Sequence, residues 1–219
     1  MLYSIFANNS WPLSLIIFLA YLVAVLLTLS LHNFFQAFTA YKQGDMTAKA
    51  YGMLSLNPFR HVSALGMVFL VLVGFGWSKS VPMNPMQFKQ GRKGAIKVAL
   101  SGMIGNLIVS IIFSFLYVLT FYITSESSFA VFLQNFCLFM TIINFVFFVF
   151  NLLPIYPLDM FMFLSLILSE NNKFLQFMFK WGFVILLILL LTNLLSLLIS
   201  VMQMAILNPL FHLWEIILF

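Results

Sequence analysis

A histidine and a glutamine one helical turn apart have the spacing of a metal site. His32 and Gln36 belong to the stretch His32-Asn33-Phe34-Phe35-Gln36, where the first long apolar run turns polar. On a helix these two positions share one face, as do the two zinc-binding histidines of H-E-x-x-H, in which the glutamate is the general base. Here Asn33 stands at the position of the base and Gln36 at that of the second ligand. The helical spacing of the motif is present, but two of its three functional residues, the glutamate and the second histidine, are replaced.

Asp159 is the second residue whose sequence context suggests a functional role. It ends the stretch 151–159, in which Pro154 and Pro157 break an apolar helix at membrane depth. A carboxylate inside a membrane is costly, so by default it marks a functional site. We expect Asp159 to lie on the same side of the membrane as His32, at a similar depth. None of the other acidic residues is within a helical turn of His32; they are Asp45, Glu126, Glu170 and Glu215.

The composition indicates an all-α polytopic membrane protein. Of the 219 residues 63% are hydrophobic and only 7% are charged, with a mean hydropathy of +1.11. A soluble domain has about 25% charged residues, so this chain could not cover a soluble surface. We assign the net charge of +5 to membrane topology and expect no nucleic-acid partner. With the single Cys137, a disulfide framework is excluded. No cleavable signal peptide is evident, and residues 1–219 are expected to form one membrane domain.

Long apolar runs predict the membrane spans. About 20 apolar residues cross a bilayer as a helix. The first helix is expected to continue to Tyr41 and to stop near Gly44, which leaves His32 and Gln36 at the inner end of the membrane. Small and polar residues from Ser101 to Asn106 allow close helix packing and an interhelical hydrogen bond. The expected spans are 11–31, 98–123, 129–150 and 183–201, and a terminal apolar segment, 205–219, is assigned to the interface.

The distribution of basic residues orients the chain. If the glycine-containing run 62–77, only 16 residues long, does not span, all eight Lys and Arg between 42 and 97 lie on one side. The positive-inside rule then makes residues 42–97 cytoplasmic, with 62–77 as a re-entrant segment and 52–56 as a candidate short strand. The eight are Lys42, Lys49, Arg60, Lys79, Lys89, Arg92, Lys93 and Lys97, against only Lys173 and Lys180 elsewhere.

Four motifs in a fixed order resemble the site-2 protease family of intramembrane zinc metalloproteases. The match covers about residues 30–160, with 161–219 as additional C-terminal helices, and it implies a bacterial-type cytoplasmic membrane and Asp159 as the third zinc ligand. The motifs are Gly44-Asp45-Met46-Thr47-Ala48 with Leu54-Ser55-Leu56-Asn57-Pro58 and His61, Phe75-Gly76-Trp77-Ser78-Lys79 with Val81-Pro82-Met83-Asn84-Pro85, Gly102 with Asn106, and Asn151-Leu152-Leu153-Pro154-Ile155-Tyr156-Pro157-Leu158-Asp159.

The differences from the family pattern are concentrated at the residues that would bind zinc and act as the general base. Catalytic zinc takes three protein ligands and keeps an open position for water. His32 and Asp159 supply two ligands, while Gln36 offers a neutral amide oxygen and Asn33 cannot take a proton from water. The site residues His32, Gln36 and Asp159 are therefore expected to be a vestigial zinc site without a catalytic base, and no cofactor is expected. His32 either keeps some metal binding or bonds a nearby polar group, and Asp159 is expected to pair with His32 or backbone amides. Larger side chains, Phe35 and Met160, are expected to fill the former cavity.

The leading hypothesis is a catalytically inactive pseudoprotease, an integral multi-pass protein that binds a transmembrane helix or a partner membrane protein in the lipid bilayer. No soluble small-molecule substrate is expected. One alternative is an active intramembrane zinc metalloprotease with a rebuilt site that uses zinc and draws on His61 or a partner chain. Another is a structural or assembly subunit of a membrane complex. The expected partner groove contains Gly102, Asn106, Asn151, Pro154 and Pro157.

Overall fold

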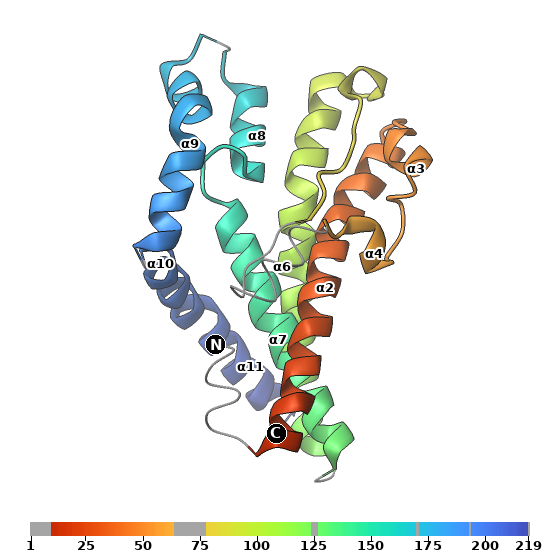
Figure 1. The fold of residues 1–219 in the computed structure, drawn as a ribbon, viewed down its shortest axis with the longest axis vertical. Coiled ribbons are helices and arrows are strands. Elements are labelled where there is room, and N and C mark those ends of the chain that lie inside the picture. Colours follow the sequence, from red (N-terminus) through yellow and green to blue (C-terminus); the bar gives the residue numbers. More distant parts are fainter. Residues whose placement is uncertain (1–9, 64–77, 124–126, 170, 193, 219) are drawn as a thin grey trace.

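A computed structural model describes residues 10–63, 78–123, 127–169, 171–192 and 194–218 (Figure 1). The described residues are almost all in helices or in the turns between them, and they contain no β-strand. Five of their helices are long and apolar enough to cross a membrane. The predicted all-α polytopic fold is therefore confirmed.

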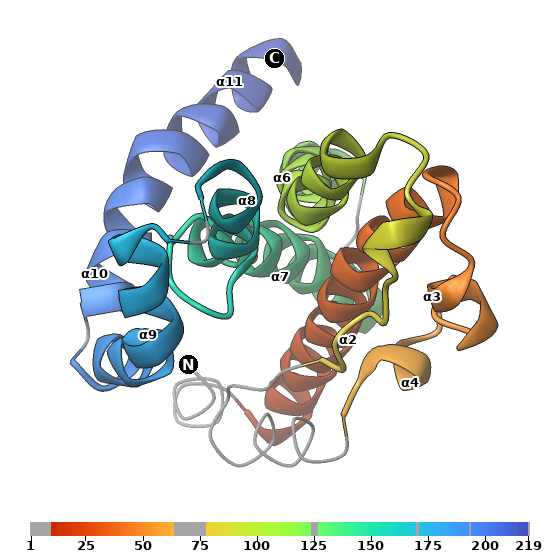
Figure 2. The same ribbon diagram turned by 90° about the horizontal axis from the view of Figure 1, so that it is seen from above.

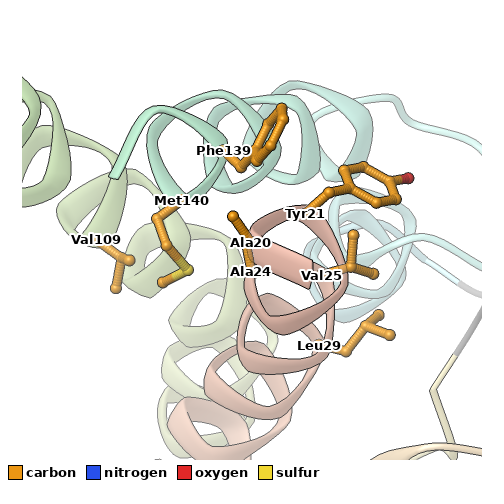
Figure 3. Close-up of a cluster of buried hydrophobic side chains, with 8 residues drawn as sticks. All are labelled: Ala20, Tyr21, Ala24, Val25, Leu29, Val109, Phe139 and Met140. Carbon is orange, nitrogen blue, oxygen red and sulfur yellow. The ribbon is translucent and has the colours of Figure 1, made fainter. Parts of the chain in front are cut away.

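Three long helices form the core of the bundle. They are α2 (Trp11–Lys42), α6 (Gly91–Ile123) and α7 (Ser128–Asn151). Alanines on α2 are fully buried against the other two helices, because a small side chain lets helix backbones approach closely in a membrane (Figure 3). The predicted first and third spans agree with α2 and α7, and Gly44 follows the end of α2 with φ 102°. Helix α6 begins seven residues before the predicted span, so its basic first two turns extend toward the polar loops.

The prediction for the C-terminal third of the chain was wrong at one point. Residues 183–201 do not form one span, because α9 (Lys173–Leu191) ends inside that range. Helix α9 starts at Asn172, whose side-chain oxygen accepts hydrogen bonds from the N–H groups of Phe174 and Leu175. Starting there, it completes a membrane-length helix by Leu191. The final segment is part of a further candidate span, Leu194–Leu218, built from α10 (Leu194–Met202), a π-helical turn (Gln203–Leu207) and α11 (Asn208–Leu218).

The loop motifs are held together by side chains that they contain. Asp45 accepts hydrogen bonds from the backbone N–H of Thr47 (2.8 Å) and of Asn84 (2.7 Å), which joins two motifs that are 39 residues apart. Two asparagines act as N-caps: Asn57 for the short helix α4 (Pro58–His61) and Asn84 for the 3-10 turn Pro85–Gln87. The loop motifs that the sequence retains therefore have a structural role that does not depend on catalysis.

The short strand expected at 52–56 is absent. Gly52 has φ 70°, a left-handed conformation that closes a turn, and bends follow it. Among the described residues the only β-type pairing is an isolated antiparallel bridge between Val62 and Ser78. Beside it, the N–H of Lys79 donates to the carbonyl of His61 (2.6 Å). Val62 and Ser78, which flank the predicted re-entrant segment, are therefore adjacent in the structure. The segment itself, residues 64–77, lies outside the described residues.

Acidification is expected to weaken the Asp45 clamp. Burial raises the pKa of Asp45, but the hydrogen bonds from Thr47 and Asn84 outweigh it and leave the pKa below its ordinary value. Because the folded pKa is depressed, the stabilisation is present above the unfolded pKa of about 3.9 and is lost as the pH falls through the folded pKa. Hydrogen-exchange protection of the Thr47 and Asn84 amides should decrease over that range.

The Asp45→Asn variant separates this effect from general acid denaturation. At neutral pH it should lower protection at both amides about tenfold or more, because hydrogen bonds to a charged group contribute about 1.5–3 kcal/mol. Its protection should then change little as the pH is lowered toward 3. The matched control is Glu215→Gln, an exposed carboxylate on α11 that should leave both amides unchanged. Equal pH dependence in wild type and Asp45→Asn would contradict the assignment.

Candidate functional site

The inner half of α2 and the first residue of a short helix meet at the candidate site. His32, Asn33 and Gln36 are all buried on the side of α2 that faces α7 and the chain that follows it. After α7, a turn places Asp159 as the first residue of α8 (Asp159–Ile167), which lies in the upper part of the bundle beside α9 (Figure 1). A carboxylate in the first turn of a helix is favoured by the partial positive charge of the helix N-terminus.

Three side chains of this site are in direct contact. His32 Nε2 lies 3.3 Å from Asp159 Oδ2. The amide nitrogen of Gln36 donates to Asp159 Oδ1 (2.9 Å) and lies 3.4 Å from His32 Nε2. The structure thus brings together the three residues predicted as the vestigial zinc site, and the predicted pairing of Asp159 with His32 is confirmed.

Asn33 forms its hydrogen bonds outside this cluster of three side chains. Its Nδ2 donates to the backbone carbonyl of Lys79 (2.9 Å), and its Oδ1 accepts from the hydroxyl of Ser78 (3.3 Å). An ionised glutamate at this position could not donate to the carbonyl, so the amide suits a tie between α2 and the extended segment after residue 77. Sequence reasoning missed Ser78 and Lys79 as partners of Asn33. The available signal was their place in the second motif of the family pattern.

Two glycines on α6 provide the space for this face of α2. A Cβ at Gly102 would lie 2.6 Å from His32 Cε1, and a Cβ at Gly105 would lie 2.0 Å from Phe35 Cδ2. Phe35 therefore packs against α6, and it is not among the residues that line the cavity beside the site. Met160 is not among the cavity-lining residues either.

The buried polar residues of α6 do not all act as expected. Asn106 is fully buried, but neither its amide nitrogen nor its oxygen has a hydrogen-bond partner among the described residues. One turn further along α6, Ser110 makes the predicted type of interhelical hydrogen bond, from its Oγ to the carbonyl of Thr141 (2.8 Å). A second such bond joins Asn144 Nδ2 to Thr28 Oγ1 (2.8 Å). These bonds hold α2 and α6 against α7 beneath the site.

A cavity of about 660 Å³ opens beside the site. Its long walls are apolar and come from α2, α7, α9 and α10. Figure 2 shows these four helices from above, with α7 between α2 and the pair α9 and α10. Its polar end consists of His32, Asn33, Gln36, Ser78, Lys79, Ser80, Asn151 and Asp159. Of the five residues predicted for the groove, Asn151 and Pro157 line this cavity. Gly102 and Asn106 lie on α6 behind α2, and Pro154 is an exposed residue outside the lining.

The donor atoms at the site do not fit a catalytic zinc ion. Two ligands at about 2.0–2.1 Å from a tetrahedral zinc lie about 3.3–3.4 Å apart, so the His32–Asp159 spacing is compatible with a metal. The third group is an amide whose nitrogen faces Asp159, which leaves its oxygen, the only atom of the amide that could bind a cation, on the other side. Among the described residues no three His, Cys, Asp or Glu side chains cluster as a metal site.

The remaining histidines do not complete this set. His61 belongs to α4, where its Nε2 lies 2.6 Å from the carbonyl of Ser55, and it is absent from the cavity lining. His212 lies on α11 beside Glu215, at 3.5 Å, and both side chains are exposed. Neither residue joins His32 and Asp159 in the part of the chain that the structure describes.

Two curated proteins are similar in sequence to this chain. A Bacillus subtilis protein named "Putative zinc metalloprotease YwhC" is 37% identical over 151 residues, which are 68% of this chain and 68% of that protein. A Mycolicibacterium smegmatis protein named "Putative zinc metalloprotease Rip2" is 30% identical over 193 residues, 85% of this chain and 72% of that protein. This chain belongs to the site-2 protease family. No family model matches the chain, and no solved structure matches it.

Membership of the site-2 protease family agrees with the fold. The five candidate spans make this member a multi-pass integral membrane protein. The loop motifs that carry the resemblance are also the ones joined by Asp45, Asn57 and Asn84. In this member of the family, Asn33 and Gln36 lie beside His32 on the inner half of α2.

Proposed function

We propose that this chain is a catalytically inactive member of the site-2 protease family that binds a transmembrane segment of a partner membrane protein in the cavity beside His32 and Asp159. The observation that carries the proposal is the contact of Gln36 with both residues. Its amide donates to Asp159 and approaches His32, so the two groups that could bind zinc are occupied by a neutral side chain of the protein.

Under this proposal, the groups missing from the site are those that would contribute most to the rate of hydrolysis. A general base contributes about 10²–10⁴-fold to a rate, and Asn33 has no titratable group. Without a metal, the lowered pKa of a metal-bound water is lost as well. Asn33 is also bonded to Lys79 and Ser78, so its position serves the fold of the loop. These features support a role that does not include peptide-bond hydrolysis.

The dimensions and chemistry of the cavity support a segment of polypeptide as its occupant. Its lining along α2 runs from Tyr21 to Gln36, which corresponds to about 22 Å of helix. Most of that length is apolar, as a transmembrane helix would require. A soluble ligand would have to leave water for a site surrounded by membrane helices. The proposal also places residues 42–97 on the cytoplasmic side of a bacterial cytoplasmic membrane, because this end carries most of the basic residues.

Metal analysis and crosslinking test the two halves of the proposal. Protein purified after growth with zinc should contain well under one zinc per chain. A photo-crosslinking amino acid at Val25, in the cavity wall, should capture a membrane protein, whereas the same group at Leu19, exposed on another face of α2, should not.

Two results would overturn the proposal. The first is stoichiometric zinc that is lost in Asp159→Asn, together with cleavage of a model transmembrane substrate that stops in the same variant. This result would establish an active protease with a rebuilt site. The second is co-purification with one fixed partner that is captured equally from Val25 and Leu19, as expected for an assembly subunit that does not use the cavity.

A further inference from the structure

We propose that the transmembrane segment held in the cavity carries a side-chain hydrogen-bond donor, such as the amide of Asn or Gln, which faces Asp159. This inference rests on the function proposed above and names the chemistry of the partner. The carboxylate and the imidazole at the polar end have acceptor capacity that the protein itself leaves unused. A segment that supplies a donor at this level would complete the site.

Asp159 and His32 line the polar end of the cavity and retain unused acceptor capacity. An ionised carboxylate can accept about four hydrogen bonds, whereas the side chain of Asp159 receives one from Gln36 and lies 3.3 Å from His32 Nε2. A neutral imidazole has one donor and one acceptor, and only a proton on Nε2 makes the 3.3 Å approach to Asp159 attractive. The other ring nitrogen, Nδ1, is then an acceptor, and it has no hydrogen-bond partner among the described residues. Both side chains are about nine-tenths buried.

Three of the neighbouring polar side chains use a donor within the protein. Asn33 donates to the carbonyl of Lys79, and Ser78 donates to Asn33. The amide of Asn151 donates to the carbonyl of Phe147 (3.0 Å), and its oxygen accepts from the backbone N–H of Asp159. Lys79 itself is exposed, and within the described residues its ammonium makes no ion pair with Asp159. Among the described residues the Asp159 carboxylate is contacted by the side chains of Gln36 and His32, so a further donor at this end is left to the occupant of the cavity.

The apolar walls of the cavity make binding selective for a segment that carries a hydrogen-bond donor. Beside side chains such as Leu29 and Phe147, an entirely apolar segment would leave the acceptors without partners, at a cost that water cannot remove. An acidic side chain at the same level would meet the Asp159 carboxylate as a like charge. A donor gains instead, because hydrogen bonds between membrane helices add to association. The site should therefore prefer Asn over Leu and Leu over Asp at one position of the bound helix.

Synthetic helices test the preference directly. Three peptides of about 20 Leu and Ala residues, identical except for Asn, Leu or Asp at the level of Asp159, are titrated against the labelled protein in phospholipid vesicles by energy transfer. With the wild-type protein, the Asn peptide should bind about 3- to 20-fold more tightly than the Leu peptide, and the Asp peptide more weakly than either. Moving the Asn by one residue along the peptide turns it to another face and should remove its advantage.

Two protein variants separate the inference from the function on which it rests. Asp159→Asn retains the shape of the side chain but removes its charge, and it should reduce the Asn advantage while raising the affinity of the Asp peptide. Val25→Trp narrows the cavity and should weaken all three peptides alike. Equal binding of the Asn and Leu peptides, with both weakened by Val25→Trp, would overturn the inference and leave the proposed function standing. Absence of binding by any peptide, or binding that Val25→Trp does not change, would overturn both.

Discussion

Replacing Gln36 with histidine is expected to give this protein a zinc site. The amide nitrogen of Gln36 lies 2.9 Å from Asp159 and 3.4 Å from His32, so an imidazole at this position would reach the same space as the other two groups. The three protein ligands of a catalytic-type zinc site would then be present, with separations close to the 3.3–3.4 Å or so expected around tetrahedral zinc. Metal analysis of Gln36→His should find about one zinc per chain, where the wild type has far less.

Controls for this gain use the same helix and the same site. Phe38→His places a histidine on an exposed face of α2, away from Asp159, and should add no zinc. Gln36→His with Asp159→Asn should lose most of the added metal, because it removes the charged ligand. If Gln36→His binds no more zinc than Phe38→His, the three positions do not form the ligand set of this family, and the assignment of a vestigial zinc site is wrong.

Hydrolysis is not expected to return with zinc alone. Asn33 still occupies the position of the base, and its hydrogen bonds to Lys79 and Ser78 hold it on the loop. Adding Asn33→Glu to Gln36→His supplies a carboxylate, but it exchanges a donor to the Lys79 carbonyl for an acceptor and so loosens the segment after residue 77. Cleavage of a model transmembrane substrate should therefore remain undetectable in Gln36→His and should be weak at most in the double variant.

Replacing Gly105 with alanine is expected to destabilise the bundle strongly. The added Cβ would lie 2.0 Å from Phe35 Cδ2 and 2.5 Å from Phe35 Cγ, well inside contact distance. The half-buried ring of Phe35 packs against the core cluster of the bundle, so it must shift or turn to admit the added methyl group. Overpacking of this kind costs about 1–3 kcal/mol, and the two close contacts place this case toward the upper end. The midpoint of thermal unfolding in detergent should fall clearly below that of the wild type.

A double-mutant cycle identifies the cause. Phe35→Ala alone should lower stability because it leaves a cavity, but Phe35→Ala with Gly105→Ala should be more stable than the sum of the two single changes predicts. Ile104→Ala, at an exposed position next to Gly105, is the matched control and should have a small effect. Additive effects of Phe35→Ala and Gly105→Ala would show that the glycine does not serve the aromatic ring.

Much of the fold and part of the site were predictable from local sequence. Length and apolarity define the helices α2, α6 and α7, because a bilayer requires about 20 apolar residues whatever their neighbours are. The identity of Asn33 and Gln36 decides which chemistry their side chains can perform. The pairing of His32 with Asp159 followed from placing both residues on the same side of the membrane at similar depth.

Other features depended on how the helices pack. Phe35 was expected in the cavity, but the crossing of α2 and α6 at Gly105 directs it the other way. The break after α9 depends on where that helix starts, which the cap at Asn172 sets and hydropathy does not record. The partners of Asn33 come from a loop 45 and 46 residues away in sequence.

The sequence by itself determined the family, the membrane fold and the donor atoms that residues 32–36 carry. Those follow from composition, from motif order and from covalent identity, all of which are local. Only the tertiary structure decided that Gln36 bridges His32 and Asp159 and that an apolar cavity remains beside them. The physical reason is that a hydrogen bond between α2 and α8, like a void between helices, is fixed by the relative placement of whole elements.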